Sequence, residues 1–342
     1  MTTNSSEIRD MPSFKKVHYA LRPRKQIERK IIIELLRDTT RKINVEISNY
    51  GYLGMGSIYY YDFILFHKFL NIASMTSLDS DTCVNRFEFN KPFDFIDFKN
   101  KSTSNYLQEY QLATNKNTVT WFDYDSSLLW YSSKAEKFRH SVDILDDIAM
   151  IADRSKRYDF FLITVDVTLP ADIFITLPRR KELIDNYRTV LSRKYQNTRN
   201  ITEANFPYII QNVILNSIKN VEIGKNCKFR KLFSFYYKDS APMYTLGGIF
   251  DENQFTHRTL KNKFFVFDED KITDINTPLL TYKEKLHLDQ RIKFIYDSIQ
   301  GKQKEEIEKL ITTNLGFELN CVDIKSYLEY YKYYPQYYEG II

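Results

Sequence analysis

Cysteine and long apolar runs are both scarce in this chain of 342 residues. Its three cysteines, Cys83, Cys227 and Cys321, lie far apart without a CxxC pair, which argues against a disulfide framework and a cysteine-rich zinc site and suits a reducing cytoplasm. No apolar run reaches the roughly 18 residues that a membrane-spanning helix needs. The start lacks the apolar segment of a secretory signal and is expected to be a short flexible lead-in. We therefore expect a cytoplasmic protein with no membrane partner.

Several catalytic signatures are absent as well. His140, His257 and His287 have no partner at metal-ligand spacing, and no metal centre is predicted from them. No Ser-His-Asp arrangement, P-loop or HExxH motif occurs, so a hydrolase or a nucleoside triphosphatase has no specific support.

Positive charge is concentrated near the N-terminus. The net charge is only +5, yet residues 15–42 contain ten Lys or Arg residues against three acids. Apolar residues at helical spacing between Ile27 and Leu36 predict an amphipathic helix that begins just after Pro23 and has a basic outer face. That face either is solvated at one edge of the core or contacts a nucleic-acid backbone, so nucleic acid is a candidate partner.

Short apolar runs alternate with helical segments from residue 45 onward, which is typical of a parallel sheet with crossover helices. The strand candidates are YGYLG, IASMTSLD, FDFIDF, TVTWFDYD and YDFFLITVDV, and the helix candidates lie at residues 58–70, 104–112, 138–152, 179–194 and 206–221. Residues 227–252 then predict an antiparallel hairpin that turns at Asp239–Pro242. The rest of the chain is mainly helical and strongly charged.

These patterns predict an α/β fold with a doubly wound, mostly parallel sheet closed by an antiparallel hairpin. An N-terminal helix and a C-terminal helical appendage complete it. We divide the chain into a lead-in with the basic helix (1–44), the α/β domain (45–250) and the mainly helical appendage (251–342). The tyrosine-rich end of the appendage, SYLEYYKYYPQYYEGII, predicts a helix that docks on the core or a partner interface, rather than a surface for single-stranded nucleic acid.

Glycine is rare, with nine residues in the whole chain, yet three lie between Gly51 and Gly56. They follow the first predicted strand, so we expect Gly54 and Gly56 to take positive φ or to let a ligand approach the backbone. Ser57 would cap the helix that follows. The N–H groups of this turn, including that of Met55, would then face a nucleoside or dinucleotide.

An acidic residue stands where such a site needs one. Asp79 follows Gly56 by 23 residues, at the end of the second predicted strand, and Asp81 is a neighbouring candidate. A carboxylate at this place accepts hydrogen bonds from ribose hydroxyls. The alternative is that the glycines only make a tight turn and that Asp79 caps the next helix.

The motifs YLGMGSI, SLD and WFDYDS, after the first, second and fourth predicted strands, resemble those of the class I, Rossmann-like S-adenosylmethionine-dependent methyltransferases over residues 45–250. The hairpin is similar to the one that ends the sheet of that superfamily. The resemblance implies S-adenosylmethionine as cofactor, an unknown methyl acceptor, and these cofactor-binding residues: Gly54, Met55, Gly56, Ser57, Asp79 and, for adenine, Asp97. Tyr52 stands where an acid is usual, and Ile58 replaces the third glycine. Further segments such as SIYYYDF indicate a divergent bacterial branch.

Candidates for the acceptor side follow the fourth predicted strand. In TWFDYDSSL, alternation places Asp123 and Asp125 on one side and Phe122 and Tyr124 on the other. A carboxylate there could hold or deprotonate a hydroxyl or an amine, and Tyr124 or Trp121 could stack on a flat substrate. We predict Asp123, Tyr124 and Asp125 as catalytic residues. The alternatives are a core role for the aromatic residues and an oxygen-ligand Mg²⁺ or Ca²⁺ site at the two acids.

Three functions stay open at this point. The first is a methyltransferase, and the second is a catalytically degenerate binding or scaffold protein of the same fold that touches nucleic acid through the basic helix. The third is a nicotinamide-dependent oxidoreductase. The hairpin favours methyl transfer, because the resemblance implies an antiparallel last strand whereas a nicotinamide-binding domain ends with a parallel one.

Overall fold

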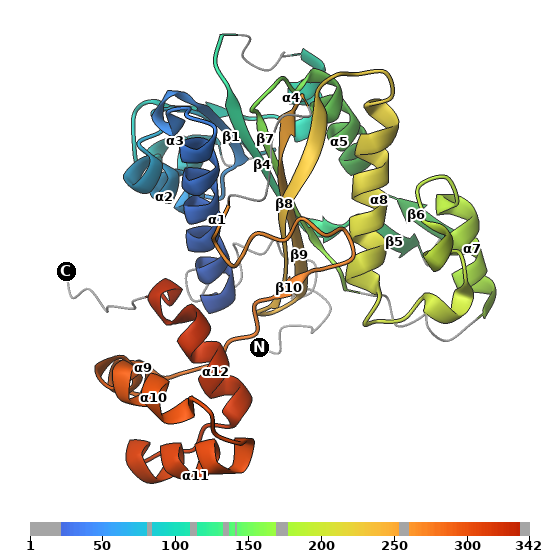
Figure 1. Cartoon of the computed structure of the whole chain (residues 1–342). Helices are drawn as coiled ribbons and strands as arrows, with labels where there is room; N and C mark the ends of the chain where they lie inside the picture. The colour runs from blue at the N-terminus through green and yellow to red at the C-terminus, as the bar shows by residue number, and fades with distance from the viewer. Residues whose placement is uncertain are drawn as a thin grey trace, which may run out of the picture.

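A single eight-stranded sheet organises the chain, as a computed structural model shows (Figure 1). The structure describes residues 22–80, 84–109, 115–132, 137–140, 142–168, 177–252 and 260–335. The strand order is β10-β8-β9-β7-β4-β1-β2-β3, and the strands are β1 (Gly51–Met55), β2 (Ser74–Leu78), β3 (Ile96–Lys99), β4 (Thr118–Ser127), β7 (Phe160–Asp166), β8 (Lys228–Lys238), β9 (Pro242–Asp251) and β10 (Thr273–Asp274). Strand β9 is antiparallel to both neighbours, and the other pairs are parallel. The predicted parallel sheet closed by an antiparallel hairpin is confirmed.

Helices cover both faces of the sheet (Figure 1). The helices are α1 (Pro23–Lys42), α2 (Tyr61–Leu70), α3 (Val84–Phe89), α4 (Thr103–Glu109), α5 (Val142–Arg154), α7 (Leu177–Tyr187), α8 (Phe206–Val221), α9 (Tyr282–Gln290), α10 (Ile292–Ile299), α11 (Lys304–Leu315) and α12 (Cys321–Tyr330). Helices α1 and α2 bury side chains on one face, and α4, α5, α7 and α8 do so on the other. Among the described residues, none of the helices has the length and hydropathy of a membrane span.

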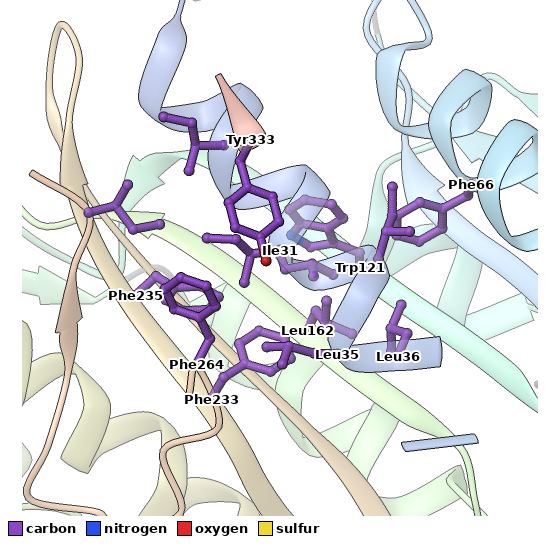
Figure 2. Close-up of a cluster of buried hydrophobic side chains, with 14 of the residues drawn as sticks. Ile31, Leu35, Leu36, Phe66, Trp121, Leu162, Phe233, Phe235, Phe264 and Tyr333 are labelled. Atoms are coloured by element: carbon purple, nitrogen blue, oxygen red, sulfur yellow. The ribbon is translucent and has the colours of Figure 1, made fainter. Parts of the chain in front are cut away.

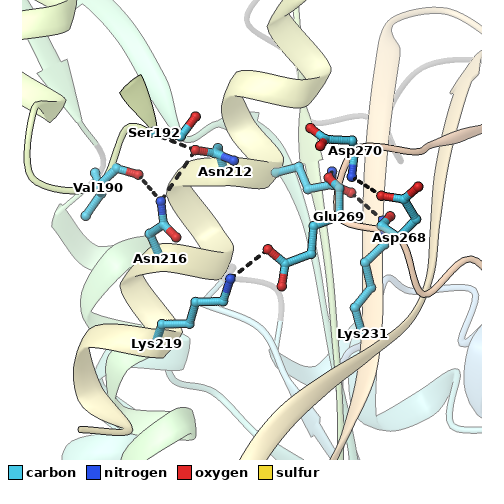
Figure 3. Close-up of polar contacts among 10 residues, drawn as sticks. Val190, Ser192, Asn212, Asn216, Lys219, Lys231, Asp268, Glu269 and Asp270 are labelled. Carbon is cyan, nitrogen blue, oxygen red and sulfur yellow. Dashed lines mark hydrogen bonds and ion pairs between the residues drawn. The ribbon is translucent and has the colours of Figure 1, made fainter. Parts of the chain in front are cut away.

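Two predicted helices have different bounds in the structure. The helix expected at 138–152 begins only at Val142, because residues 137–140 form strand β6, which pairs with β5 (Leu129–Ser132) in a small hairpin. The helix expected at 179–194 ends at Tyr187. Beyond it, side chains of α8 hold the chain instead: Asn212 accepts a hydrogen bond from the Ser192 backbone N–H at 2.8 Å, and Asn216 donates to the Val190 carbonyl at 2.7 Å (Figure 3).

Helix α1 packs flat on the sheet. Its residues Ile31 and Leu35 are fully buried in the cluster that contains Trp121, Leu162 and Phe233 (Figure 2). Each such aliphatic side chain contributes about 1.5–3 kcal/mol relative to exposure. Five consecutive residues of this helix, 25–29, are buried, and Lys25, Glu28 and Arg29 among them are at most 3% exposed. The expectation of a basic, solvated outer face is therefore wrong for this turn of α1.

The C-terminal helices lie beside the N-terminal end of α1 (Figure 1). The tyrosine-rich segment holds them there: the Tyr333 hydroxyl donates to Glu34 of α1, and Lys30 of α1 donates to the Tyr334 carbonyl at 2.9 Å. Tyr330 stacks on Phe264 with ring centroids 5.6 Å apart. The prediction that this segment docks on the core is confirmed up to residue 335, and residues 336–342 lie outside the described residues.

Candidate functional site

The carboxyl ends of β1, β2 and β4 meet where the strand order reverses. Strand β1 pairs in parallel with β2 on one side and with β4 on the other. Strand β3 then follows β2 on the first side, and β7 follows β4 on the second, so the order of the strands reverses at β1. Open α/β sheets bind ligands in the crevice beyond such a switch point. The predicted site residues therefore have to be judged by their distance from this edge.

Gly54 in β1 and Gly56 just after it serve packing within the chain. Neither Gly54 nor Gly56 has positive φ, so that expectation is wrong. A Cβ on Gly54 would lie closer than 3.0 Å to the Tyr52 ring. A Cβ on Gly56 would lie closer than 3.0 Å to the Ser77 hydroxyl oxygen and 3.2 Å from the Tyr60 ring. The space that glycine leaves is thus filled by side chains of this protein.

Ser57 does not cap the helix after the turn, contrary to expectation. Helix α2 begins at Tyr61, and its N-cap is Tyr60, a left-handed residue with φ of 49° and no side-chain cap. The Ser57 hydroxyl oxygen instead accepts the Tyr59 backbone N–H at 3.3 Å, inside the turn. The first turn of α2 carries its own carboxylate, Asp62.

Arg29 of α1 contacts that carboxylate. Its Nε donates to Asp62, and both side chains are almost fully buried. The favourable place for an anion at a helix N-terminus is therefore taken by a residue of the chain. This pair also fixes α1 against α2 beside the switch point.

Asp79 lies where the sequence predicts it. It comes directly after β2, and its backbone N–H donates to the Lys99 carbonyl of β3 at 3.3 Å. Met55, the last residue of β1, is in register with Leu78, the last residue of β2. Gly56 and Asp79, which follow them, are therefore side by side. Asp81 lies outside the described residues.

Tyr60 borders the same place. Burial raises the pKa of its phenol, and its hydroxyl donates to the Phe87 carbonyl at 3.1 Å. Its ring would lie 3.2 Å from a Cβ on Gly56, and Gly56 and Asp79 each follow by one residue the registered pair Met55 and Leu78. The structure thus brings Gly56, Tyr60 and Asp79 together.

Asp97 and Met55 stand apart from this group. Asp97 is the second residue of β3, and its side chain is 56% exposed and pairs with Lys99 at 3.0 Å. It therefore does not lie at the carboxyl end of its strand with Asp79. Met55, the last residue of β1, packs half-buried against the helices on the far face of the sheet.

Asp123 sits on the face that α1 covers, at the carboxyl end of the sheet. Its Oδ1 lies 2.9 Å from Nζ of Lys25, and Oε2 of Glu28 lies 3.0 Å from the same nitrogen. Next to it, Thr164 of β7 is in register with Asp123, and Thr245 of β9 is in register with Thr164. A polar row thus crosses three adjacent strands under the first turns of α1.

Trp121 supports this row from below. Its Nε1–H donates to Thr164 at 3.0 Å, and the Thr164 and Thr245 hydroxyl groups lie 2.8 Å apart. The indole is fully buried, stacks on Phe66 with ring centroids 6.0 Å apart, and has the Lys25 ammonium 4.8 Å above it. Trp121 is thus a core residue, as the alternative interpretation held, and presents no open face for a flat substrate.

Tyr124 points to the opposite face, so the predicted alternation along β4 is confirmed. Its hydroxyl donates to Asp147 of α5 at 2.6 Å and lies 3.1 Å from the Thr103 hydroxyl. Burial, and then the charge of Asp147, raises the pKa of this phenol well above its ordinary value. The structure does not bring Tyr124 together with Asp123, whereas Asp125 is exposed and lies within the register shift that follows Asp123.

The family model described as "Putative O-methyltransferase" matches residues 17–342, nearly the whole chain. The chain belongs to this family. With it, the class I S-adenosylmethionine-dependent methyltransferase assignment is confirmed, and the cofactor is S-adenosylmethionine. The match includes the N-terminal helix and the C-terminal helices, so these parts belong to the family's common chain.

Solved structures of methyltransferases resemble the chain weakly. One is titled a putative O-methyltransferase from Klebsiella pneumoniae (8% identity, 71% of this chain and 85% of that chain, TM-score 0.38). Another is a putative class I S-adenosylmethionine-dependent methyltransferase from Listeria monocytogenes (11% identity, 79% and 68%, TM-score 0.38). A third is the N-methyltransferase NodS from Bradyrhizobium japonicum (9% identity, 66% and 97%, TM-score 0.34). Among curated proteins, none matches the chain.

Sequence reasoning missed the charged residues that this methyltransferase places on the buried side of α1. Lys25, Glu28, Ile32 and Leu35 follow one another at intervals of three and four, so they share one helical stripe. A lysine and a glutamate in register with core aliphatic residues were the available signal. Tyr237 of β8, whose ring lies 5.6 Å from the Lys25 ammonium, had no such signal.

The described residues contain no group of three or more His, Cys, Asp or Glu side chains that could hold a metal ion. Asp123 contacts a lysine, and Asp125 is exposed beyond it. A cation site at these two acids therefore has no support in the described part of the chain.

Proposed function

We propose that the chain transfers the methyl group of S-adenosylmethionine to an oxygen atom of a small acceptor, beside Asp123 of β4. The observation that carries the proposal is that Asp79, just after β2, and Asp123, within β4, are both level with Gly56, the first residue beyond β1, and lie on either side of it. The family description, which names O-methyltransferases, supports oxygen rather than nitrogen as the acceptor atom.

Asp79 fits the cofactor better than the glycine turn does. Its carboxylate lies at a strand end beside Gly56, where it would accept hydrogen bonds from the ribose hydroxyls. The space beside Gly54 and Gly56 is filled by the side chains of Tyr52 and Ser77, so it is not open to a ligand. The cofactor, when bound, supplies a methyl group activated by the positive sulfur.

Asp123 would act on the acceptor. Two acids, Asp123 and Glu28, contact Lys25. The side chain of Asp123 is 16% exposed whereas that of Glu28 is fully buried, so Asp123 is the one that an acceptor can reach. An acceptor hydroxyl would be oriented by the carboxylate and would lose its proton to it while its oxygen forms the bond to the methyl carbon; the bond from that carbon to sulfur would break, leaving S-adenosylhomocysteine. Asp125, which is exposed, would be a second contact, and Tyr124 has no part in this role.

The domain division then gives each part a task. Residues 45–250 carry Asp79 and Asp123, residues 1–44 supply the helix that covers Asp123, and residues 251–342 hold that helix in place. The free, partly or fully buried thiols of Cys227 and Cys321 suit a reducing compartment, and we place the protein in the cytoplasm.

A degenerate binding protein is the second candidate, because the filled glycine turn favours it. Nucleic-acid contact through α1 loses support, since Arg24, Lys25 and Arg29 are engaged within the chain. A gel-shift assay over a range of salt concentrations tests it, because phosphate contacts weaken steeply as salt rises.

Calorimetry separates these functions. We expect S-adenosylmethionine and S-adenosylhomocysteine to bind and NAD not to bind. Asp79→Ala should weaken both by tenfold or more, about 1.4 kcal/mol, because hydrogen bonds to a charged group contribute about that much. Asp97→Ala, a change of an exposed acid on the next strand, is the matched control and should bind as the wild type does. If no adenosyl ligand binds the wild type, the methyltransferase proposal fails and the binding-protein reading stands.

Methyl transfer itself needs a second assay. Release of S-adenosylhomocysteine is measured with catechol, simple phenols and small carboxylic acids as probe acceptors. Asp123→Asn should lower the rate on any active probe by about 10²–10⁴-fold, which is the usual contribution of a general base. An Asn variant as fast as the wild type would remove Asp123 from the mechanism.

A further inference from the structure

A lysine on α1 is held between two carboxylates and two aromatic rings in the interior. Nζ of Lys25 lies 2.9 Å from Asp123 and 3.0 Å from Glu28, and the Trp121 and Tyr237 rings lie 4.8 and 5.6 Å away. The side chain of Lys25 is 4% exposed and that of Glu28 is fully buried. An acceptor can therefore reach Asp123 but not the two residues of α1.

The charges of this group do not balance. Two carboxylates, Glu28 and Asp123, share one ammonium, with Arg29 of α1 as the next cation and Tyr237 of β8 as the nearest phenol. Burial lowers the pKa of Lys25, but the attraction of Asp123 and Glu28 outweighs it, and the pKa ends well above its ordinary value. Burial raises the pKa of Glu28 in spite of Lys25. Lys25 is thus a fixed cation between the two carboxylates.

The backbone of α1 fixes the lysine as well. The carboxylate of Asp239, in the β8–β9 turn, accepts the backbone N–H groups of Arg24 at 3.3 Å and of Lys25 at 3.1 Å. Arg24 also donates to the Thr277 carbonyl at 2.8 Å, which ties the start of α1 to the C-terminal part of the chain. Lys25 therefore has little freedom to leave Asp123.

We propose that Lys25 and Glu28 form a positioning pair for Asp123, in which Lys25 fixes the direction of the Asp123 carboxylate while Glu28 holds Lys25. The proposal rests on the proposed role of Asp123 in methyl transfer. Neither residue of the pair touches the acceptor, so both act through Asp123. The arrangement explains why charged residues stand in the core-facing stripe of α1.

Carbon-13 NMR of protein labelled at the aspartate carboxyl groups tests the pair without cofactor or acceptor. The Asp123 signal is the one that disappears in Asp123→Asn. In Lys25→Met/Glu28→Leu at neutral pH, this signal should shift and broaden, because the carboxylate loses the ammonium that lies 2.9 Å from it. In Glu28→Gln the signal should broaden but shift less, because Lys25 stays beside Asp123 and has lost the carboxylate that holds it.

The double variant is chosen so that it folds. Removing one member of a buried ion pair leaves an uncompensated charge, whereas replacing both with apolar residues of similar size is often neutral for stability. A circular dichroism melt confirms the fold before the NMR measurement. A double-variant Asp123 signal with the position and width of the wild-type signal overturns the pair.

The two proposals fail separately. Undiminished methyl transfer by Asp123→Asn would overturn the proposed function of Asp123, whatever the NMR signal does. On an active probe acceptor, the double variant should lower kcat by about tenfold or more while KM stays within about twofold, because neither residue touches the acceptor and a displaced base slows the chemical step. A kcat equal to that of the wild type overturns the pair alone.

Discussion

The variant Gly56→Ala tests whether this glycine serves packing within the chain or the approach of a ligand to the backbone. A Cβ at this position would lie closer than 3.0 Å to the Ser77 hydroxyl oxygen, 3.2 Å from the Tyr60 ring and 3.3 Å from the Phe63 ring. All three neighbours are buried, so they have little room to retreat. Overpacking of this kind costs about 1–3 kcal/mol, and we expect urea denaturation to show a loss of unfolding free energy in that range.

A second substitution separates packing from ligand approach. Since the closest clash is with the hydroxyl oxygen of Ser77, the double variant Gly56→Ala/Ser77→Ala should regain most of the lost stability, and the two changes should couple by about 1 kcal/mol or more. If the glycine serves packing alone, S-adenosylhomocysteine binding by calorimetry should return with stability. Gly51→Ala is the matched control on β1, because its Cβ would meet nothing closer than 3.4 Å.

Two results would refute this reasoning. Wild-type stability of Gly56→Ala would show that the neighbours yield without cost, and the packing role would then be wrong. A double variant that is stable but no longer binds the adenosyl ligand would show that the ligand needs the bare backbone of Gly56. The glycine would then have the role that the sequence alone suggested.

Two further predictions concern other parts of the molecule. Asp239→Ala removes the acceptor for two N–H groups in the first turn of α1, and we expect a loss of about 1 kcal/mol in urea denaturation; unchanged stability would contradict this capping role. Burial lowers the pKa of Lys231 to about 8, so between pH 8 and 10.5 the unfolded chain binds more protons and stability should rise with pH, by up to about 3 kcal/mol relative to Lys231→Met. A difference that stays flat or falls over this window would refute the shift, and Lys219→Met, which removes an exposed ion pair beside it (Figure 3), should change stability by less than about 1 kcal/mol.

Local pattern determined much of the fold. The alternation of short apolar runs with helical segments predicts the parallel strands and places Asp79 at a strand end, because both the strand period and the helix period are properties of neighbouring residues. Asp123 was expected to follow its strand, but β4 continues to Ser127. Helix α8 has the predicted bounds, and the hairpin of β8 and β9 turns within 239–242 as the sequence indicates. The weak points were short elements such as β6, whose four residues are too few for a period to show.

Tertiary structure alone decided which side chains meet. Lys25 and Asp123 are 98 residues apart, and nothing in either segment indicates the other. The spaces beside Gly54 and Gly56 look the same in sequence whether a ligand or the Tyr52 and Ser77 side chains fill them. Period and propensity act over a few residues, whereas contacts across a sheet depend on strand order and register, which the whole chain sets together. The sequence by itself therefore determined the succession of strands and helices and the place of Asp79 after its strand. The packing of α1 on the sheet determined the partners of Asp123.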